Sequence, residues 1–203
     1  MTSLPSPPST TYLLAAFCGG AANIFLGSSS LYWRELNEVL PQTLVAYRIV
    51  LSLCMLAALI FLGQGFYELK KLRFRTVCLH CGASLLVATN WGVFIWASIN
   101  GHILESGFGY LLAPFLSISM GVLFYREPLK SPQIISMIIV FSSAALLALY
   151  SHELNHWIYI LIAATWGTYT CLKKATSLSA INGLFVETAF LSICLTLATA
   201  IFK

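Results

Sequence analysis

The chain has 203 residues, of which 59% are hydrophobic and 9% are charged, and its formal net charge is +4. A soluble domain usually has about a quarter charged residues, so this composition excludes an ordinary soluble protein and predicts a membrane protein surrounded by the lipid bilayer. Most basic residues lie in short segments between apolar runs, so the net charge does not indicate a nucleic-acid partner.

Seven apolar segments follow an N-terminal tail, residues 1–11, which has no basic residue and so lacks the start of a cleaved signal peptide. A membrane-spanning helix needs about 20 largely apolar residues. The segments run near residues 12–32, 42–62, 77–99, 103–124, 132–150, 157–172 and 183–202. The sixth is the shortest and could fall below a hydropathy threshold. The predicted fold class is therefore all-α, a polytopic membrane bundle of about seven transmembrane helices.

Loops rich in Lys and Arg alternate along the chain with loops that have few or none. The loops at 63–76, 125–131 and 173–182 contain eight Lys and Arg residues, whereas the opposite side has only Arg34 and Lys203. Basic loops of membrane proteins face the cytoplasm. This contrast predicts a multi-pass protein of the inner (plasma) membrane, with its N-terminus in the cytoplasm.

The stretch HELNH, residues 152–156, has the spacing of a zinc-protease motif, His-Glu-x-x-His. Zinc hydrolysis needs both histidines on one face of a regular helix, with a third ligand nearby. Here the motif fills a tight turn between Tyr150 and Trp157, so an interfacial polar turn is the favoured interpretation and a membrane metalloenzyme the alternative. We therefore predict no catalytic residues, no metal and no cofactor, and we expect that the protein is not an enzyme.

A second motif, Cys78-Leu79-His80-Cys81, has the CxxC spacing at the start of the third segment. One isolated pair is a weak signal for metal or redox chemistry. The sequence interpretation is that these residues are ordinary helix positions, with a metal or redox role as the alternative.

Ionisable and amide side chains lie inside the apolar segments, where they are costly and often mark a transport pathway. Arg48 lies in the second segment, Glu105 in the first turn of the fourth, and Glu187 about one turn into the seventh. Asn23 and Asn90 lie near the middle of the first and third segments. They either line a cavity between helices or, for the charged ones, extend to the interface or form structural pairs.

In the fourth segment, five residues recur at every fourth position and would form a ridge along one face of the helix. Its members are Glu105, Gly109, Ala113, Ser117 and Gly121. Small residues at this spacing let another helix approach closely. The ridge is therefore interpreted first as a packing surface.

The region of the first two segments resembles that of the last two. Each has a short span, a basic exit, a polar connection and then a span with one early charge, Arg48 in the first copy and Glu187 in the second. Five spans separate the copies, so the second would be inverted, which is a feature of transporters. This predicts a five-helix repeat over residues 12–150 and a partial inverted repeat of two helices over residues 157–203.

The stretch NWGVFIWASINGHILESGFGYLLAPF, residues 90–115, resembles the RarD-type permeases (chloramphenicol-sensitive protein family) of the EamA branch of the drug/metabolite transporter superfamily. The matching positions are Asn90, Trp91, Ile95, Trp96, Ala97, Asn100, Glu105, Gly109, Tyr110 and Pro114. Weaker similarities extend from about residue 12 to the end of the chain.

The resemblance implies a permease that moves a small organic solute or drug-like metabolite by alternating access. The residues expected to contact the solute are Asn23, Asn90, Trp91, Glu105 and Tyr110. Arg48 and Glu187 are expected to form a charge pair or a gate, and proton exchange at Glu187 would couple transport to a proton gradient.

Permeases of this kind are similar to ten-helix proteins, whereas seven segments are predicted here. The alternative function is therefore a truncated, non-transporting membrane protein that acts as an assembly partner or is a degenerate paralogue. A homodimer or complementing membrane helices from another chain are the expected protein partners.

Overall fold

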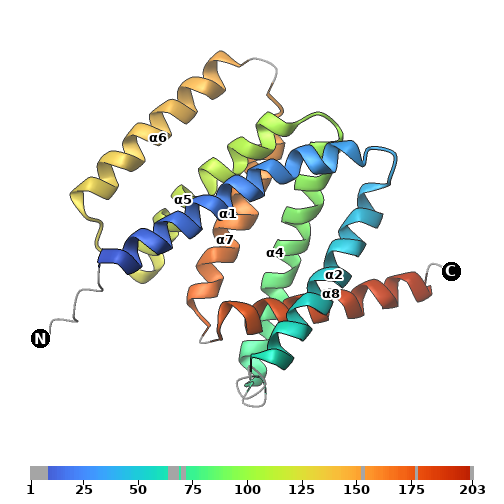
Figure 1. The fold of residues 1–203 in the computed structure, drawn as a ribbon. Helices are drawn as coiled ribbons and strands as arrows, with labels where there is room; N and C mark the ends of the chain where they lie inside the picture. The colour runs from blue at the N-terminus through green and yellow to red at the C-terminus, as the bar shows by residue number, and fades with distance from the viewer. Residues whose placement is uncertain (1–8, 64–68, 70–71, 152–153, 177, 202–203) are drawn as a thin grey trace, which may run out of the picture.

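The computed structural model describes residues 9–63, 69, 72–151, 154–176 and 178–201. Seven helices of the described residues form a bundle without strands (Figure 1). They are α1 (Ser9–Glu35), α2 (Pro41–Leu62), α4 (Phe74–Ile99), α5 (Ile103–Tyr125), α6 (Ser131–Tyr150), α7 (His156–Lys174) and α8 (Ala180–Ile201). The predicted all-α polytopic fold is confirmed, and the described part of each of the seven apolar segments lies in one of these helices.

Five of these helices, namely α2, α4, α5, α6 and α8, are long and apolar enough to cross a membrane. Helices α1 and α7 are less apolar and are not among these five. Helix α7 packs closely against α4 and α5 and buries residues on several sides, including Thr165 and Gly167. A helix that is largely enclosed by protein meets less lipid, so it tolerates polar residues that would be costly on a lipid-facing helix.

The small-residue ridge of α5 packs against α7, as its spacing predicted. At Gly109, a Cβ atom would lie 2.7 Å from the Cβ of Ile162 and 3.0 Å from the carbonyl oxygen of Tyr159. One turn further along, Gly167 of α7 lies equally close to α5, because a Cβ there would be 2.8 Å from the Cβ of Leu116. The two backbones therefore approach each other at positions where only glycine leaves room.

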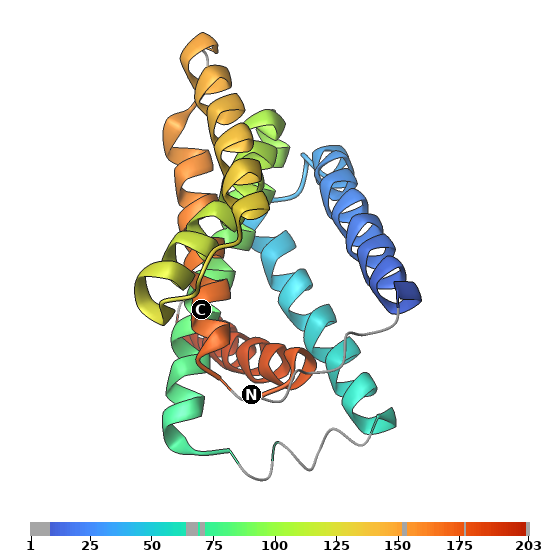
Figure 2. The ribbon, with the colours of Figure 1, turned by 90° about the vertical axis from the view of Figure 1, so that its left-hand side faces the viewer.

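The remaining helices surround this pair. Helix α8 packs on α2 and α4 and crosses them steeply in Figure 1, while α6 is peripheral and buries only Ala144 among its residues. Figure 2 shows α1 on the opposite side of the bundle from α6. The tight connection between α4 and α5 depends on Gly101, whose φ of 84° lies in the left-handed region that glycine adopts readily. The polar residues described below lie mainly on α4, α5 and α7, with Glu187 on α8.

Candidate functional site

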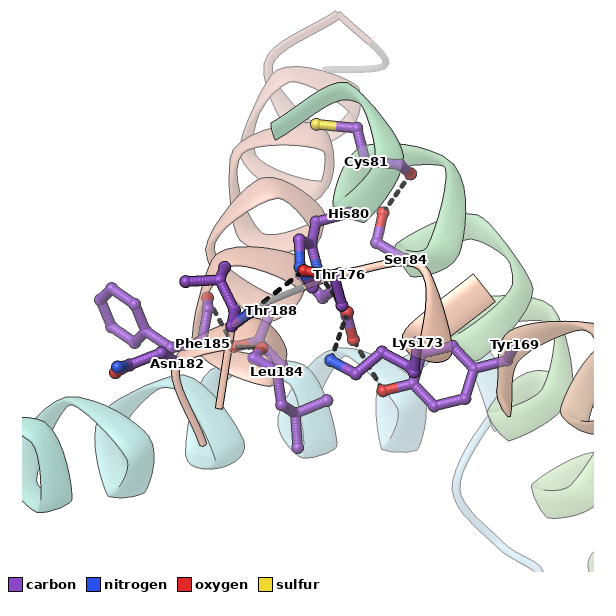
Figure 3. Close-up of polar contacts among 12 residues, drawn as sticks. His80, Cys81, Ser84, Tyr169, Lys173, Thr176, Asn182, Leu184, Phe185 and Thr188 are labelled. Carbon is purple, nitrogen blue, oxygen red and sulfur yellow. Dashed lines mark hydrogen bonds and ion pairs between the residues drawn. The ribbon is translucent and has the colours of Figure 1, made fainter. Parts of the chain in front are cut away.

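The carboxylate of Glu187, seven residues into α8, is fully buried, and three side chains from α4 and α7 contact it. These three, His80, Tyr169 and Lys173, are labelled in Figure 3. Its Oε1 atom lies 2.6 Å from His80 Nδ1 and 3.0 Å from Lys173 Nζ. Its Oε2 atom accepts a 2.9 Å hydrogen bond from the Tyr169 hydroxyl. We call His80, Tyr169, Lys173 and Glu187 the carboxylate cluster.

The local fold explains how this cluster forms. His80 lies in the second turn of α4 and is itself fully buried, and its Nε2 atom contacts the Thr176 hydroxyl at 3.0 Å just after α7. Gly183, one turn before Glu187, leaves the space that the cluster occupies. A Cβ atom at Gly183 would lie 2.8 Å from His80 Cε1 and still closer to Lys173 Nζ.

His80 and Glu187 form the shortest contact of the carboxylate cluster. A carboxylate accepts hydrogen bonds, and one imidazole nitrogen is a donor or an acceptor depending on the tautomer. The 2.6 Å contact therefore holds one proton between Nδ1 and Oε1. Lys173 supplies a positive charge at the same oxygen atom, and its side chain is 19% exposed.

A second buried polar group, the asparagine cluster, consists of Asn90, Tyr110 and Thr165. The Asn90 amide nitrogen donates to the carbonyl oxygen of Ile162 at 3.1 Å and to the Thr165 hydroxyl at 3.0 Å. The Tyr110 hydroxyl donates a 2.6 Å hydrogen bond to Asn90 Oδ1. Asn90 is 1% exposed, so these contacts satisfy an amide that would otherwise be unpaired in the interior.

Trp166 joins the two clusters, because its ring lies edge-to-face with Tyr110 and is stacked on Tyr169. The ring centroid of Trp166 is 6.0 Å from that of Tyr110 and 5.3 Å from that of Tyr169. Tyr110 belongs to the asparagine cluster and Tyr169 to the carboxylate cluster. A continuous series of contacts therefore runs from Asn90 to Glu187 through α5 and α7.

Arg48 of α2 lies beside this series. Its guanidinium carbon is 4.3 Å from the ring centroid of Trp91 on α4, which is a cation–π contact. The side chain is half-buried. Among the residues that the structure describes, no carboxylate forms an ion pair with Arg48.

Glu105 lies elsewhere, at the start of α5. Its Oε1 atom contacts His102 Nδ1 at 2.9 Å and accepts a 3.4 Å hydrogen bond from the Asn155 backbone. Together with Tyr150 and Ser151 it lines a cavity of about 630 Å³ at this end of the bundle. No contact that the structure records joins Glu105 to the asparagine cluster.

The structure thus brings some of the predicted site residues together and separates others. Asn90 contacts Tyr110, and Trp91 contacts Arg48. The charge pair that we expected between Arg48 and Glu187 is not formed, because Glu187 is occupied by His80 and Lys173 on α4 and α7. The side chain of Asn23 is outside the described residues, so its place in the lining stays a prediction.

Sequence reasoning missed the partners of Glu187. His80 was considered only as part of a CxxC motif, although a histidine inside an apolar segment is itself a signal. Lys173 was counted as a loop charge. Tyr169 and Lys173 are four residues apart and therefore share one face of α7, which would have predicted that both point the same way.

The two motifs that suggested metal chemistry have different outcomes. Within HELNH, His152 and Glu153 lie outside the described residues, so that motif is not tested. Elsewhere in the described part of the chain, no three His, Cys, Asp or Glu side chains gather as a metal site would require. In the CxxC motif, Cys78 and Cys81 are both free thiols, and His80 points to Glu187 instead.

The fold and its interior polar clusters define a multi-pass helical membrane protein, and comparison with known proteins adds the family. The chain is 33% identical to the uncharacterized transporter YojE of Bacillus subtilis over 170 residues, which cover 81% of this chain and 57% of that protein. It is 30% identical to Protein RarD of Streptomyces exfoliatus over 167 residues, which cover 81% and 53%. An uncharacterized transporter of Pseudomonas aeruginosa is also 30% identical, with 84% and 57% covered.

These relatives confirm the resemblance predicted from the sequence: the chain is similar to proteins named RarD and to uncharacterized transporters. It spans somewhat more than half the length of the curated relatives it matches. No family model and no solved structure matches it.

Proposed function

We propose that the protein acts as a permease that moves a small organic solute across the membrane by alternating access. The observation that supports this most strongly is the continuous series of contacts from Asn90 through Trp166 to Glu187. In transporters, solute and coupling-ion sites lie near the middle of the bilayer between packed helices. The names of the relatives, transporter and RarD, point to the same function.

The energetic cost of the carboxylate cluster also favours a function in transport. Removing a charge from water costs several kcal/mol, and apolar residues of similar size are often at least as stabilising as a buried ion pair. A bundle that needed only stability would be as well served by apolar side chains at His80, Lys173 and Glu187. We therefore assign the cluster a role in the transport cycle.

In the proposed cycle, the carboxylate cluster exchanges the coupling proton. A proton on Glu187 removes its attraction to Lys173 and changes the hydrogen bond that Tyr169 donates. The stacked rings of Tyr169 and Trp166 would transmit this change toward the asparagine cluster. Proton binding would then bias which side of the bundle opens, because a ligand shifts a conformational equilibrium by its preference for one state.

Asn90, Trp91 and Tyr110 are the proposed solute contacts. Asn23 and Glu105 keep their proposed place in the lining, with Glu105 at the cavity near one entrance, and Arg48 and Glu187 remain candidates for a gate. If residues 12–150 and 157–203 form the predicted inverted repeat, the solute site would lie between its copies.

The distribution of basic residues supports an inner-membrane location with the N-terminus in the cytoplasm. In this orientation the α4–α5 turn faces outward. An impermeant thiol reagent should therefore label an Asn100→Cys variant in intact cells, and labelling only after lysis would reverse the orientation.

We propose that the apolar outer side of α6 is covered by lipid and by a second copy of this chain or complementing helices from another chain. A strictly monomeric mass in nanodiscs would contradict the homodimer.

A panel of labelled solutes tests the permease directly. Cells that overproduce the protein should accumulate or exclude at least one solute relative to cells that lack it. The Asn90→Leu variant should lose this difference, because leucine cannot replace the three hydrogen bonds of the amide. Asn100→Leu makes the same change at an exposed position and should keep it. Equal solute levels in all strains across the panel would contradict the proposal.

A further inference from the structure

Arg48 is a charged residue at membrane depth that lacks a counter-charge among the described residues. It lies seven residues into α2, which places it ~10 Å along the helix from its start. Glu105 has His102 as its partner, and Glu187 has His80 and Lys173. The guanidinium of Arg48 lies over the face of Trp91.

The groups around Arg48 do not supply the missing negative charge. The oxygen of Asn90 accepts from Tyr110, and the hydroxyl proton of Tyr110 is used in that bond. The Trp91 ring offers its negative face but no formal charge. A guanidinium does not lose its proton in a protein, so Arg48 stays positively charged and an anion is the group that complements it.

An apolar cavity of about 590 Å³ lies beside this pair. Arg48 and Trp91 are not among its lining residues, but their direct chain neighbours Ile49 and Gly92 are, as is Val45, one turn earlier on α2. The other lining residues are Pro41, Gln42, Ala46, Val93, Trp96, Trp157 and Leu195. The site therefore combines one fixed positive charge with an adjacent apolar space.

We propose that Arg48 binds the anionic group of the transported solute, so that the solute is an amphipathic organic anion. A carboxylate or sulfonate fits because the planar guanidinium presents paired N–H donors to two oxygens. The apolar body of the solute occupies the cavity lined by Val45, Ile49 and Trp96. This proposal rests on the proposed permease function and specifies its substrate class.

Binding to the full chain in phosphatidylcholine nanodiscs tests the substrate class without requiring transport. The probes are 3-phenylpropionate and its uncharged amide, 3-phenylpropionamide, and the signal is quenching of tryptophan fluorescence. The carboxylate should bind at least about tenfold more tightly than the amide, as expected for a hydrogen bond to a charged group. In Arg48→Gln the two probes should bind equally. Arg34→Gln removes the same charge from an exposed position and should keep the preference.

Equal binding of the two probes to the unaltered protein, or a carboxylate preference that survives in Arg48→Gln, would overturn the proposal. The permease function is tested separately by the solute panel. Equal binding together with transport of a neutral solute would remove the anion class and leave the permease. A preference that depends on Arg48 without any transported solute would contradict the permease alone.

Discussion

Replacing Glu187 with glutamine is expected to abolish proton-driven solute movement while solute exchange continues. Glutamine has nearly the same shape and keeps a carbonyl oxygen for the hydrogen bond from Tyr169, but it cannot take up and release a proton. Net transport returns an empty carrier and needs the proton to leave, whereas exchange of one solute molecule for another does not. In reconstituted vesicles, uptake driven by a pH gradient should fall to the background of protein-free vesicles, and counterflow should persist.

The matched control is Glu127→Gln. Glu127 also pairs with a lysine of α7, Lys174, but both side chains are substantially exposed, so the change should leave uptake and counterflow unaltered. Unchanged proton-driven uptake in Glu187→Gln would remove the carboxylate cluster from the coupling step. Loss of both activities with a normally folded protein would assign Glu187 to solute movement itself rather than to proton coupling.

Replacing Gly109 with leucine is expected to prevent the packing of α5 on α7. Even the first side-chain atom would lie 2.7 Å from Ile162 Cβ and 3.0 Å from a backbone carbonyl oxygen, and neither position can move without displacing α7. Overpacking of a well-packed core costs roughly 1–3 kcal/mol and sometimes more, and we expect a cost at or above the upper value because backbone is involved. The measurement is the thermal transition and the monodisperse yield of purified protein.

Gly107→Leu provides the comparison on the same helix. A Cβ atom at Gly107 meets nothing within 4 Å, so this variant makes the same chemical change without the steric conflict. It should be purified in normal amount with a thermal transition close to that of the unaltered protein. Equal stability of the two variants would show that α5 and α7 do not approach each other as described.

The helices were predictable because the bilayer imposes their length. A spanning helix must satisfy its backbone internally over about 20 residues, and this requirement leaves a visible apolar run in the sequence. Helix α7 illustrates the limit of that signal. Its polar residues Thr165 and Tyr169 contact Asn90 of α4 and Glu187 of α8 rather than lipid, and average hydropathy does not distinguish those two surroundings.

The candidate site was predictable in part because polar groups within the bilayer must find their partners inside the protein. An amide such as Asn90 in an apolar run must find a partner inside the protein, and the structure provides Tyr110 and Thr165. Which partner it finds depends on how the helices pack, and the sequence does not specify this. Arg48 and Glu187 have opposite charges and were expected to pair, yet α4 and α7 bring His80 and Lys173 to Glu187 instead.

The most direct test of the account is whether solvent and solute reach the interior around Asn90. Thr165, its hydrogen-bond partner, is 6% exposed, and it should be changed to cysteine in a protein that lacks the native cysteines. An impermeant thiol reagent is predicted to label Thr165→Cys in membrane vesicles, and the transported solute should slow the reaction. A lipid-facing control, Ile139→Cys on α6, should not react. If Thr165→Cys is as inert as Ile139→Cys under every condition, the polar interior is a dry structural element and the permease account is contradicted.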